Sequence, residues 1–314
     1  MTTLITGAGL IGCHVARLLA DKGEALVLYD AAPNDAYITA VVGAARAAVV
    51  RGDVRDLPGL VQTMADHGVR RVFHTAGLIG GRVRESPYVG WAINVGGAIN
   101  VAEAARLRGV QRLVYAGTFG AYDQSITGHG PLNEDAPLGG DNPYGATKAA
   151  AEQVLRSYGA TYGVSTLICR FAGVYGPGHY LGGSSVGRLM HELAAAAAAG
   201  GPCRVSAARL GVNEYVYAKD VAQGVVLALD AGSTAHRSFN LGSGVLSTAG
   251  DIAEAIRVAA PGVGIDLRAG PPGGESPAHA RPLDLRRARN ELGYAPRFDL
   301  ATGLADYIAG LRSA

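Results

Sequence analysis

The first 170 residues alternate between short, continuously apolar runs and helical patterns, and this alternation constrains the fold more than any other feature. Runs that are apolar throughout predict strands buried on both faces, as in a parallel sheet covered by helices. The clearest helical patterns span residues 91–108 and 144–162. We therefore predict an α/β fold with a doubly wound parallel sheet. Its predicted strands are residues 4–6, 25–29, 47–50, 69–75, 112–116 and 164–170.

A glycine loop joins the first predicted strand to the first predicted helix. It matches the pattern G-x-G-x-x-G over residues 7–12. Glycines there allow a tight turn and the close approach of a pyrophosphate, and the helix N-terminus presents free amides and a partial positive charge. The loop predicts a Rossmann-type dinucleotide site. The residues expected to bind the dinucleotide are Gly7, Gly9, Leu10, Ile11 and Gly12.

Two carboxylates follow the next two strands. Asp30 ends the second strand, 18 residues after Gly12, and a carboxylate near that spacing binds the adenosine ribose hydroxyls. It would repel a 2′-phosphate, because two like charges about 4 Å apart cost roughly 1 to 4 kcal/mol between bulk water and a protein surface. We therefore expect NAD as the cofactor rather than NADP. Asp53, with Val54 beside it, is expected near the adenine amino group.

The second half of the chain follows a looser pattern. After Arg170 come loops, short strands and helices, with glycine and proline clustered at residues 176–178 and 270–274. We predict an NAD-binding Rossmann domain over residues 1–170 and a smaller α/β substrate-binding lobe over residues 171–314, some segments of which return to the first domain.

The composition excludes several classes of protein. The net charge of +2 favours no particular partner, and the lack of a basic run argues against nucleic-acid binding. The apolar segment 193–199 is too short to span a bilayer, and no signal peptide opens the chain. The cysteines lack the spacing of a metal site, so we expect no metal and free thiols in the cytoplasm. They are Cys13, Cys169 and Cys203.

A tyrosine and a lysine share one face of the predicted helix 144–162. Asn142 is the expected cap and Pro143 lies in the first turn, so Tyr144 and Lys148 are one turn apart. A phenol with a pKa of about 10 acts as a base near neutral pH only if its pKa falls by roughly 3 pH units, which requires about 4 kcal/mol. A neighbouring ammonium and the positive nicotinamide ring can supply it.

Taken together, these motifs resemble the extended short-chain dehydrogenases, also called the NAD-dependent epimerase/dehydratase family. The resemblance covers essentially the whole length and depends on the order and spacing of the matching segments. They are residues 6–12, 30, 52–54, 74–77, 94–95, 115–122, 144–148, 170–178 and 284–296.

The resemblance implies roles for further residues. Thr118 matches the family's catalytic Ser or Thr, whose hydroxyl holds the substrate oxygen while Tyr144 moves the proton and hydride passes to the nicotinamide. Lys148 would also bind the nicotinamide ribose, and Asn94 would support the site as a catalytic and cofactor-binding residue. The segment expected to line the dinucleotide is Thr75, Ala76 and Gly77.

The chain departs from the family's sugar-nucleotide pattern in several places. Gly173 stands where such members usually carry Asn, and Asn213 and residues 273–275 stand where they carry phosphate-binding Arg. The 4,6-dehydratases carry Asp-Glu after the catalytic Thr, because elimination needs an added acid and base, and Phe119-Gly120 does not supply them. The remaining candidate substrate contacts are Arg170, Gly173, His179, Arg209 and Arg281.

Three functions fit these residues. The first is an NAD-dependent dehydrogenase for a secondary alcohol on a small sugar-like or hydroxy-acid substrate, which the missing phosphate ligands favour slightly. The second is a redox-neutral 4-epimerase of a nucleotide sugar. The third is a non-catalytic dinucleotide sensor, disfavoured by the intact catalytic residues. Family resemblance further predicts a homodimer through the helices at 91–108 and 144–162.

Overall fold

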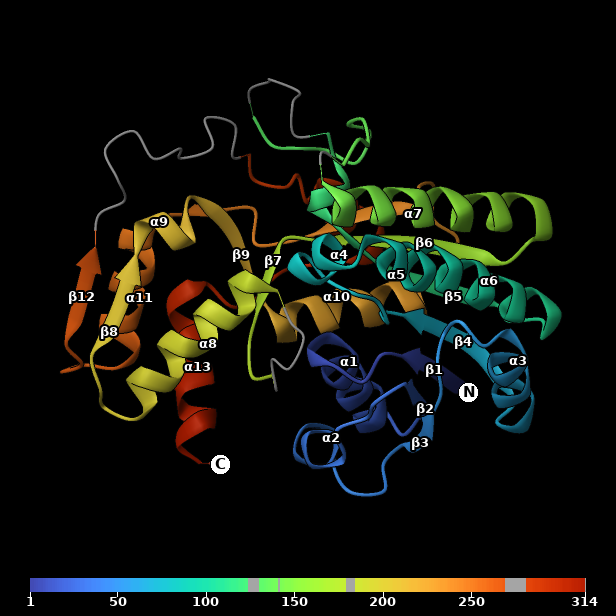
Figure 1. Cartoon of the computed structure of the whole chain (residues 1–314), viewed down its shortest axis with the longest axis horizontal. Coiled ribbons are helices and arrows are strands. Elements are labelled where there is room, and N and C mark those ends of the chain that lie inside the picture. The colour runs from blue at the N-terminus through green and yellow to red at the C-terminus, as the bar shows by residue number, and fades with distance from the viewer. Residues whose placement is uncertain (124–129, 141, 179–183, 269–280, 314) are drawn as a thin grey trace.

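A seven-stranded parallel sheet forms the centre of the molecule (Figure 1). The structure, a computed structural model, describes residues 1–123, 130–140, 142–178, 184–268 and 281–313. The strand order is β10-β6-β5-β4-β1-β2-β3, so the predicted doubly wound sheet is confirmed. The strands are β1 (Thr2–Thr6), β2 (Ala25–Asp30), β3 (Ala48–Arg51), β4 (Val69–His74), β5 (Arg112–Thr118), β6 (Ser165–Phe171) and β10 (Ser238–Leu241).

Helices cover both faces of the sheet, which explains why its strands are apolar at successive positions. Ile5 packs toward one helical layer and its neighbour Leu4 toward the other, and both are fully buried. The first layer contains α1 (Leu10–Asp21), α2 (Asp35–Val42), α10 (Ala218–Asp230) and α12 (Arg286–Leu292). The second layer contains α3 (Leu57–Asp66), α6 (Gly97–Leu107) and α7 (Pro143–Tyr162).

The helix predicted at 91–108 is interrupted by a π-helical turn. α5 (Pro87–Trp91) leads into η1 (Ala92–Gly96), which has π geometry, and α6 follows without a break. A π-turn adds one residue to the helix and is frequent at functional sites. Here it contains the buried Asn94. The short α4 (Gly81–Glu85) precedes these helices.

The later part of the chain builds a lobe beside the carboxyl ends of the strands (Figure 1). Its own core gathers α8 (Ser185–Ala198), β8 (Cys203–Ser206), α9 (Ala207–Leu210), α11 (Ala249–Ala259), β12 (Ile265–Arg268) and α13 (Leu300–Arg312). A small sheet lies between the lobe and the main sheet, and it consists of β7 (Gly173–Tyr175), β9 (Asn213–Tyr217) and β11 (Leu246–Ser247). α10, β10 and α12 return to the main sheet.

Within the part of the chain that the structure describes, no helix combines the length and apolarity needed to cross a membrane.

Candidate active site

The glycine loop forms a cradle at the end of β1. Gly7 has a φ of +89°, and a Cβ there would lie 2.8 Å from the amide nitrogen of Ala76. A Cβ on Gly12 would lie 1.9 Å from the Gly7 carbonyl oxygen, whereas one on Gly9 would meet nothing within 4 Å. Gly7 and Gly12 therefore allow close packing, and Gly9 faces open space. Gly9 caps α1 without a side-chain hydrogen bond, so these residues fit a pyrophosphate at the helix N-terminus.

Asp30 and Asp53 stand at the end of this cradle where the adenosine is predicted. Asp30 accepts the Ala8 amide through Oδ2 and the Ala32 amide through Oδ1, both at 2.8 Å. Each oxygen keeps a lone pair for a ribose hydroxyl. Asp53 is paired with Arg55, whose guanidinium lowers the pKa of the Asp53 carboxyl. Both carboxylates line the same cavity.

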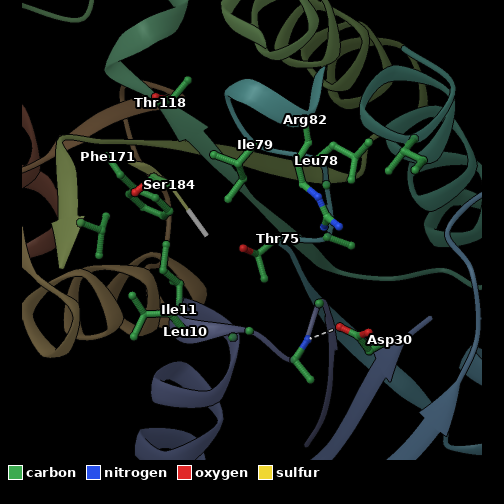
Figure 2. A pocket seen from close by; sticks show the side chains of 18 of the residues that line it. Leu10, Ile11, Asp30, Thr75, Leu78, Ile79, Arg82, Thr118, Phe171 and Ser184 are labelled. Carbon is green, nitrogen blue, oxygen red and sulfur yellow. Dashed lines mark hydrogen bonds between the residues drawn. The ribbon is translucent and has the colours of Figure 1, made fainter. Parts of the chain in front are cut away.

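That cavity, about 660 Å³ in volume, runs from the glycine loop to the start of the lobe (Figure 2). Asp30 lies at one end of the view, and Thr118, Phe171 and Ser184 lie at the other. The sequence-predicted residues that line it are Gly7, Gly9, Leu10, Ile11, Gly12, Asp30, Asp53, Val54, Thr75, Ala76, Gly77, Thr118, Tyr144 and Gly173.

Thr118 and Tyr144 meet at the nicotinamide end of the predicted dinucleotide path. Thr118 is the last residue of β5 and Tyr144 lies in the first turn of α7. Both residues line the cavity, and the Thr118 hydroxyl is near enough to lower the pKa of the Tyr144 phenol. The predicted cap of α7 is confirmed, since Asn142 Oδ1 accepts the Gly145 amide at 3.0 Å. A Cβ on Gly145 would lie 2.2 Å from the Gly120 carbonyl oxygen. The glycine therefore brings α7 close to the end of β5.

Burial sets the pKa values of the predicted catalytic pair in the protein without cofactor. Burial raises the pKa of Tyr144 to about 12, and the Thr118 hydroxyl opposes that change. Burial also lowers the pKa of Lys148 to about 8. Lys148 Nζ donates to the Ala116 carbonyl oxygen at 2.8 Å. In the protein without cofactor, removal from water therefore outweighs any nearby stabilisation of the phenolate. The lowered phenol pKa, which includes the positive nicotinamide ring, stays a prediction for the complex with NAD.

Asn94 supports the cavity wall from behind. Its Oδ1 accepts the Leu78 amide at 2.8 Å, and its Nδ2 donates to the Leu78 carbonyl at 3.0 Å and to Thr147 Oγ1 at 3.0 Å. A Cβ on Gly77 would lie 2.9 Å from Asn94 Oδ1. The side chain thus ties the loop after β4 to α7, without itself lining the cavity.

The predicted substrate arginines lie away from the described cavity wall. Arg170, only 1% exposed, is ion-paired with Glu152 and donates to the Glu134 carbonyl at 2.9 Å. The alternation of β6 turns this side chain into the core, so the expected substrate contact is wrong for Arg170. Arg209 is paired with Glu192 at 3.5 Å, and Arg281 donates to backbone carbonyls. His179 lies outside the described residues.

Arg82 is a cavity residue that the sequence analysis did not identify. It belongs to α4 and is the one cationic side chain among the described residues that line the cavity. Figure 2 shows its guanidinium directed toward the region between Thr75 and Asp30. The only signal in the sequence is an arginine a few residues after Gly77, which many surface loops share.

Comparisons with known proteins agree with this geometry. A model of the NAD dependent epimerase/dehydratase family matches residues 3–242. The chain is 31% identical over 319 residues to a UDP-glucose 4-epimerase of Mycolicibacterium smegmatis, covering 100% of this chain and 99% of the relative.

Two solved structures are similar along their whole length. A Thermus thermophilus UDP-glucose 4-epimerase in complex with NAD has a TM-score of 0.82 at 27% identity, over 100% of both chains. A Stenotrophomonas maltophila UDP-glucose-4-epimerase with bound NAD and formylated UDP-arabinopyranose has a TM-score of 0.85 at 28% identity, over 100% of this chain and 98% of that one. With its glycine cradle and the Thr118–Tyr144 pair, the chain belongs to the NAD-dependent epimerase/dehydratase family of extended short-chain dehydrogenases.

Proposed function

We propose that the protein is a redox-neutral 4-epimerase of a nucleotide sugar. The observation that carries the proposal is that Thr118 and Tyr144 line the same cavity as the glycine loop, in a chain similar over its full length to UDP-glucose 4-epimerases. These relatives favour epimerisation over the net dehydrogenase that the sequence alone favoured slightly. Phe119 and Gly120, next to Thr118, offer no acid or base for a dehydratase.

The chain's own residues supply the proton chemistry. NAD, when bound, supplies the acceptor that takes a hydride from the sugar carbon and later gives it back. The Thr118 hydroxyl holds the substrate oxygen, and Tyr144 Oη removes its proton and then returns it. Because burial places the pKa of Tyr144 at about 12, this role requires positive charge brought by the bound cofactor and Lys148. Arg82 lines the cavity where it can bind a phosphate of NAD or of the nucleotide sugar.

The test is incubation with catalytic NAD and UDP-glucose or UDP-galactose, followed by chromatography of the sugars and absorbance of NADH. We expect interconversion of the two isomers without accumulation of NADH. Tyr144→Phe should lose at least about 100-fold in turnover, the usual contribution of general acid–base catalysis, while still binding NAD by calorimetry.

A net dehydrogenase is the second candidate, favoured by the position of the arginines. Arg170, Arg209 and Arg281 do not line the described cavity, which contains a single cationic residue for all the phosphates of two nucleotides. A steady rise of NADH with free sugars or sugar acids, and no isomer from any nucleotide sugar, would replace the epimerase by this reaction.

A further inference from the structure

Lys148 carries its amine into a part of the protein that water does not reach. The residue is only 5% exposed, and burial lowers the pKa of its amine. Nζ donates to the Ala116 carbonyl oxygen at 2.8 Å. An ammonium has three donors, and a buried charge is costly unless other groups stabilise it. The Ala116 carbonyl accepts from only one of these three donors, although the proposed reaction needs the positive charge of the amine.

The ring of Tyr115 lies directly against this amine. Nζ is 4.6 Å from the centroid of the ring, within the range of a cation–π interaction. Tyr115 directly precedes Ala116 on β5, so one stretch of strand supplies both the ring and the carbonyl. A desolvated cation–π contact is among the strongest of its kind, and Tyr115 is only 1% exposed.

His74 holds the ring from the neighbouring strand. The register of β1, β4 and β5 places Thr6, His74 and Tyr115 in one row. Thr6 Oγ1 and His74 Nδ1 are 2.7 Å apart, and the centroids of the His74 and Tyr115 rings are 5.5 Å apart. Burial lowers the pKa of His74 to about 3. His74 is therefore neutral at working pH and adds no second positive charge beside Lys148.

No hydrogen bond of the Tyr115 hydroxyl explains why this residue is a tyrosine or why its side chain has this orientation. Tyr115 Oη and His74 Nε2 are both buried without a hydrogen-bond partner among the described residues. A buried hydroxyl without a partner costs free energy. The ring, rather than the hydroxyl, is thus the part of Tyr115 that acts on its surroundings.

We infer that Tyr115 is a positioning residue for Lys148: the face of its ring, with the Ala116 carbonyl, holds the lysine as an ammonium beside the catalytic tyrosine. The inference rests on the role proposed for Lys148 but not on the identity of the substrate. It adds to the Tyr144 and Lys148 pair a third residue that sets the charge of the site without touching substrate.

Among the titratable groups on α7 and on the helices packed against it, none takes the place of the Tyr115 ring beside Lys148. On α7 itself they are Tyr144 and Glu152, and Glu152 is ion-paired with Arg170 of β6. On α6, Glu103 and Arg106 pair with each other near the far end of α7, where Arg106 lies over the Tyr162 ring. On α4 and α5 they are Arg82, Arg84, Glu85 and Tyr88. Burial is the one cause that lowers the pKa of Lys148 among the described residues, with no carboxylate raising it.

The sequence makes a direct measurement possible. The chain contains three lysines, Lys22, Lys148 and Lys219. Protein labelled with carbon-13 at lysine Cε therefore gives three side-chain signals, and Lys148→Met assigns the buried one. Titration of these signals follows the ammonium itself, with and without NAD, and needs no substrate. Lys22 and Lys219 are half-exposed and paired with Asp230 and Asp306, so their midpoints should be the same in every variant.

The matched variants are Tyr115→Phe and Tyr115→Leu. Tyr115→Phe keeps the ring and removes only the unpartnered hydroxyl, so the Lys148 midpoint should stay within about 0.3 pH units of the wild type. Tyr115→Leu removes the ring and should lower the midpoint by about one pH unit, the shift that corresponds to a cation–π contact of moderate strength. An unchanged midpoint in a folded Tyr115→Leu protein would overturn the inference, as would an equal shift in both variants.

A second series of variants tests the inference even if Tyr115→Leu does not fold. Increasingly fluorinated phenylalanines at position 115 keep the shape of the ring and weaken the negative potential of its face. The Lys148 midpoint should then fall step by step with fluorination, while the melting temperature changes little. A flat series would show that the ring only fills space. Because no turnover is measured, neither result depends on whether the enzyme proves to be an epimerase.

Discussion

Lys148 lowers the stability of the fold that contains it. Its pKa is lowered by burial from 10.5 to about 8, so the folded protein releases this proton at a lower pH than the unfolded chain. Below pH 8 both states are protonated and the folded state bears the full cost of the buried charge. Between about pH 8 and 10 the unfolded chain binds more protons, so the stability linked to this group rises with pH.

Lys148→Met should therefore be more stable than the wild type at pH 7, by about 2 kcal/mol, because a buried charge gives way to an apolar side chain of similar length. The advantage should shrink toward zero near pH 10. Urea unfolding at both pH values measures it. Lys219→Met is the matched control, since Lys219 is half-exposed, and its effect should be small and independent of pH. A constant advantage for Lys148→Met would contradict the assignment.

At this scale the sequence predicts residues whose position along an element decides their role. Thr118 and Tyr144 are identified because one ends a strand and the other begins a helix, and those ends meet at the cavity. Arg170 shows where prediction from sequence position fails. It also lies near a strand end, but only the fold reveals Glu152 opposite it in the core. Arg82 is the converse, since its loop position in the sequence does not show that it faces the cavity.

Among the elements, α4 is short but carries Arg82, the one cationic side chain among the described residues that line the cavity. Arg82→Gln should weaken NAD binding about tenfold, because a charge-assisted hydrogen bond to a phosphate at a partly exposed site contributes roughly 1.5 kcal/mol. The salt dependence of binding should weaken as well. Calorimetry at low and high salt measures both.

Arg84→Gln is the control for that variant. Arg84 lies in the same short helix but does not line the cavity, so it should bind NAD as the wild type does. Equal losses in the two variants would point to a general electrostatic effect of α4. No loss in Arg82→Gln would mean that the guanidinium does not contact the cofactor, and binding of the nucleotide sugar would then be its remaining role.

A buried ion pair ties α7 to the sheet. Glu152 lies one turn beyond Lys148 and accepts from Arg170, from Arg156 and from Ser238 Oγ of β10. Glu152→Gln leaves the Arg170 charge buried without its partner, so we expect a loss of about 3 to 5 kcal/mol in unfolding free energy. Replacing both residues, as Glu152→Met with Arg170→Met, should cost less than Glu152→Gln alone. Denaturant unfolding of the single and double variants distinguishes a mutual pair from two independent contacts.

Elements with a strong pattern were predictable, and elements made by tertiary contacts were not. Six strands and the helix that carries Tyr144 follow directly from apolar runs and from the cap at Asn142. The π-turn at Asn94 was missed, because residues 91–108 read as one regular helix and the extra residue depends on the bonds of Asn94 to Leu78 and Thr147. Strand β10 was missed because four residues within a loosely patterned region carry little periodic signal.

The whole molecule should be sensitive to acid because two histidines are buried. Burial lowers the pKa of His14 to about 4 and of His74 to about 3. The unfolded chain takes up both protons near pH 6.5 and the folded protein does not, so stability falls as the pH drops below about 6.5. The slope approaches about 3 kcal/mol per pH unit where both groups differ fully.

His14→Asn should flatten this loss. Comparing unfolding free energies at pH 7 and pH 5 measures the effect, which should be about 1 kcal/mol or more in favour of the variant at the lower pH. His67→Asn, at the partly exposed end of α3, is the control for the substitution itself. A wild-type stability that is the same at both pH values would show that the histidines are not the acid-sensitive groups.

The homodimer that family resemblance predicts has a candidate surface on this molecule. Exposed apolar side chains lie on α5, at the end of α6 and at the end of α7, namely Trp91, Leu107 and Tyr162. Exposed apolar surface of this kind is typical of association sites. We expect a dimer by sedimentation velocity and a monomer for Leu107→Glu. An unchanged dimer in that variant would place the interface elsewhere.

The position of β10 at the edge of the main sheet has a consequence for how the chain is made. Residues 2–171 emerge from the ribosome with β6 as an open edge, and the strand that covers it ends at Leu241. Until about seventy more residues have been synthesised, the nascent chain presents unpaired backbone amides to any neighbouring strand. The first part of the lobe, with α8, β8 and α9, is thus translated before the sheet gains its last strand, and α11, β12 and α13 follow that strand.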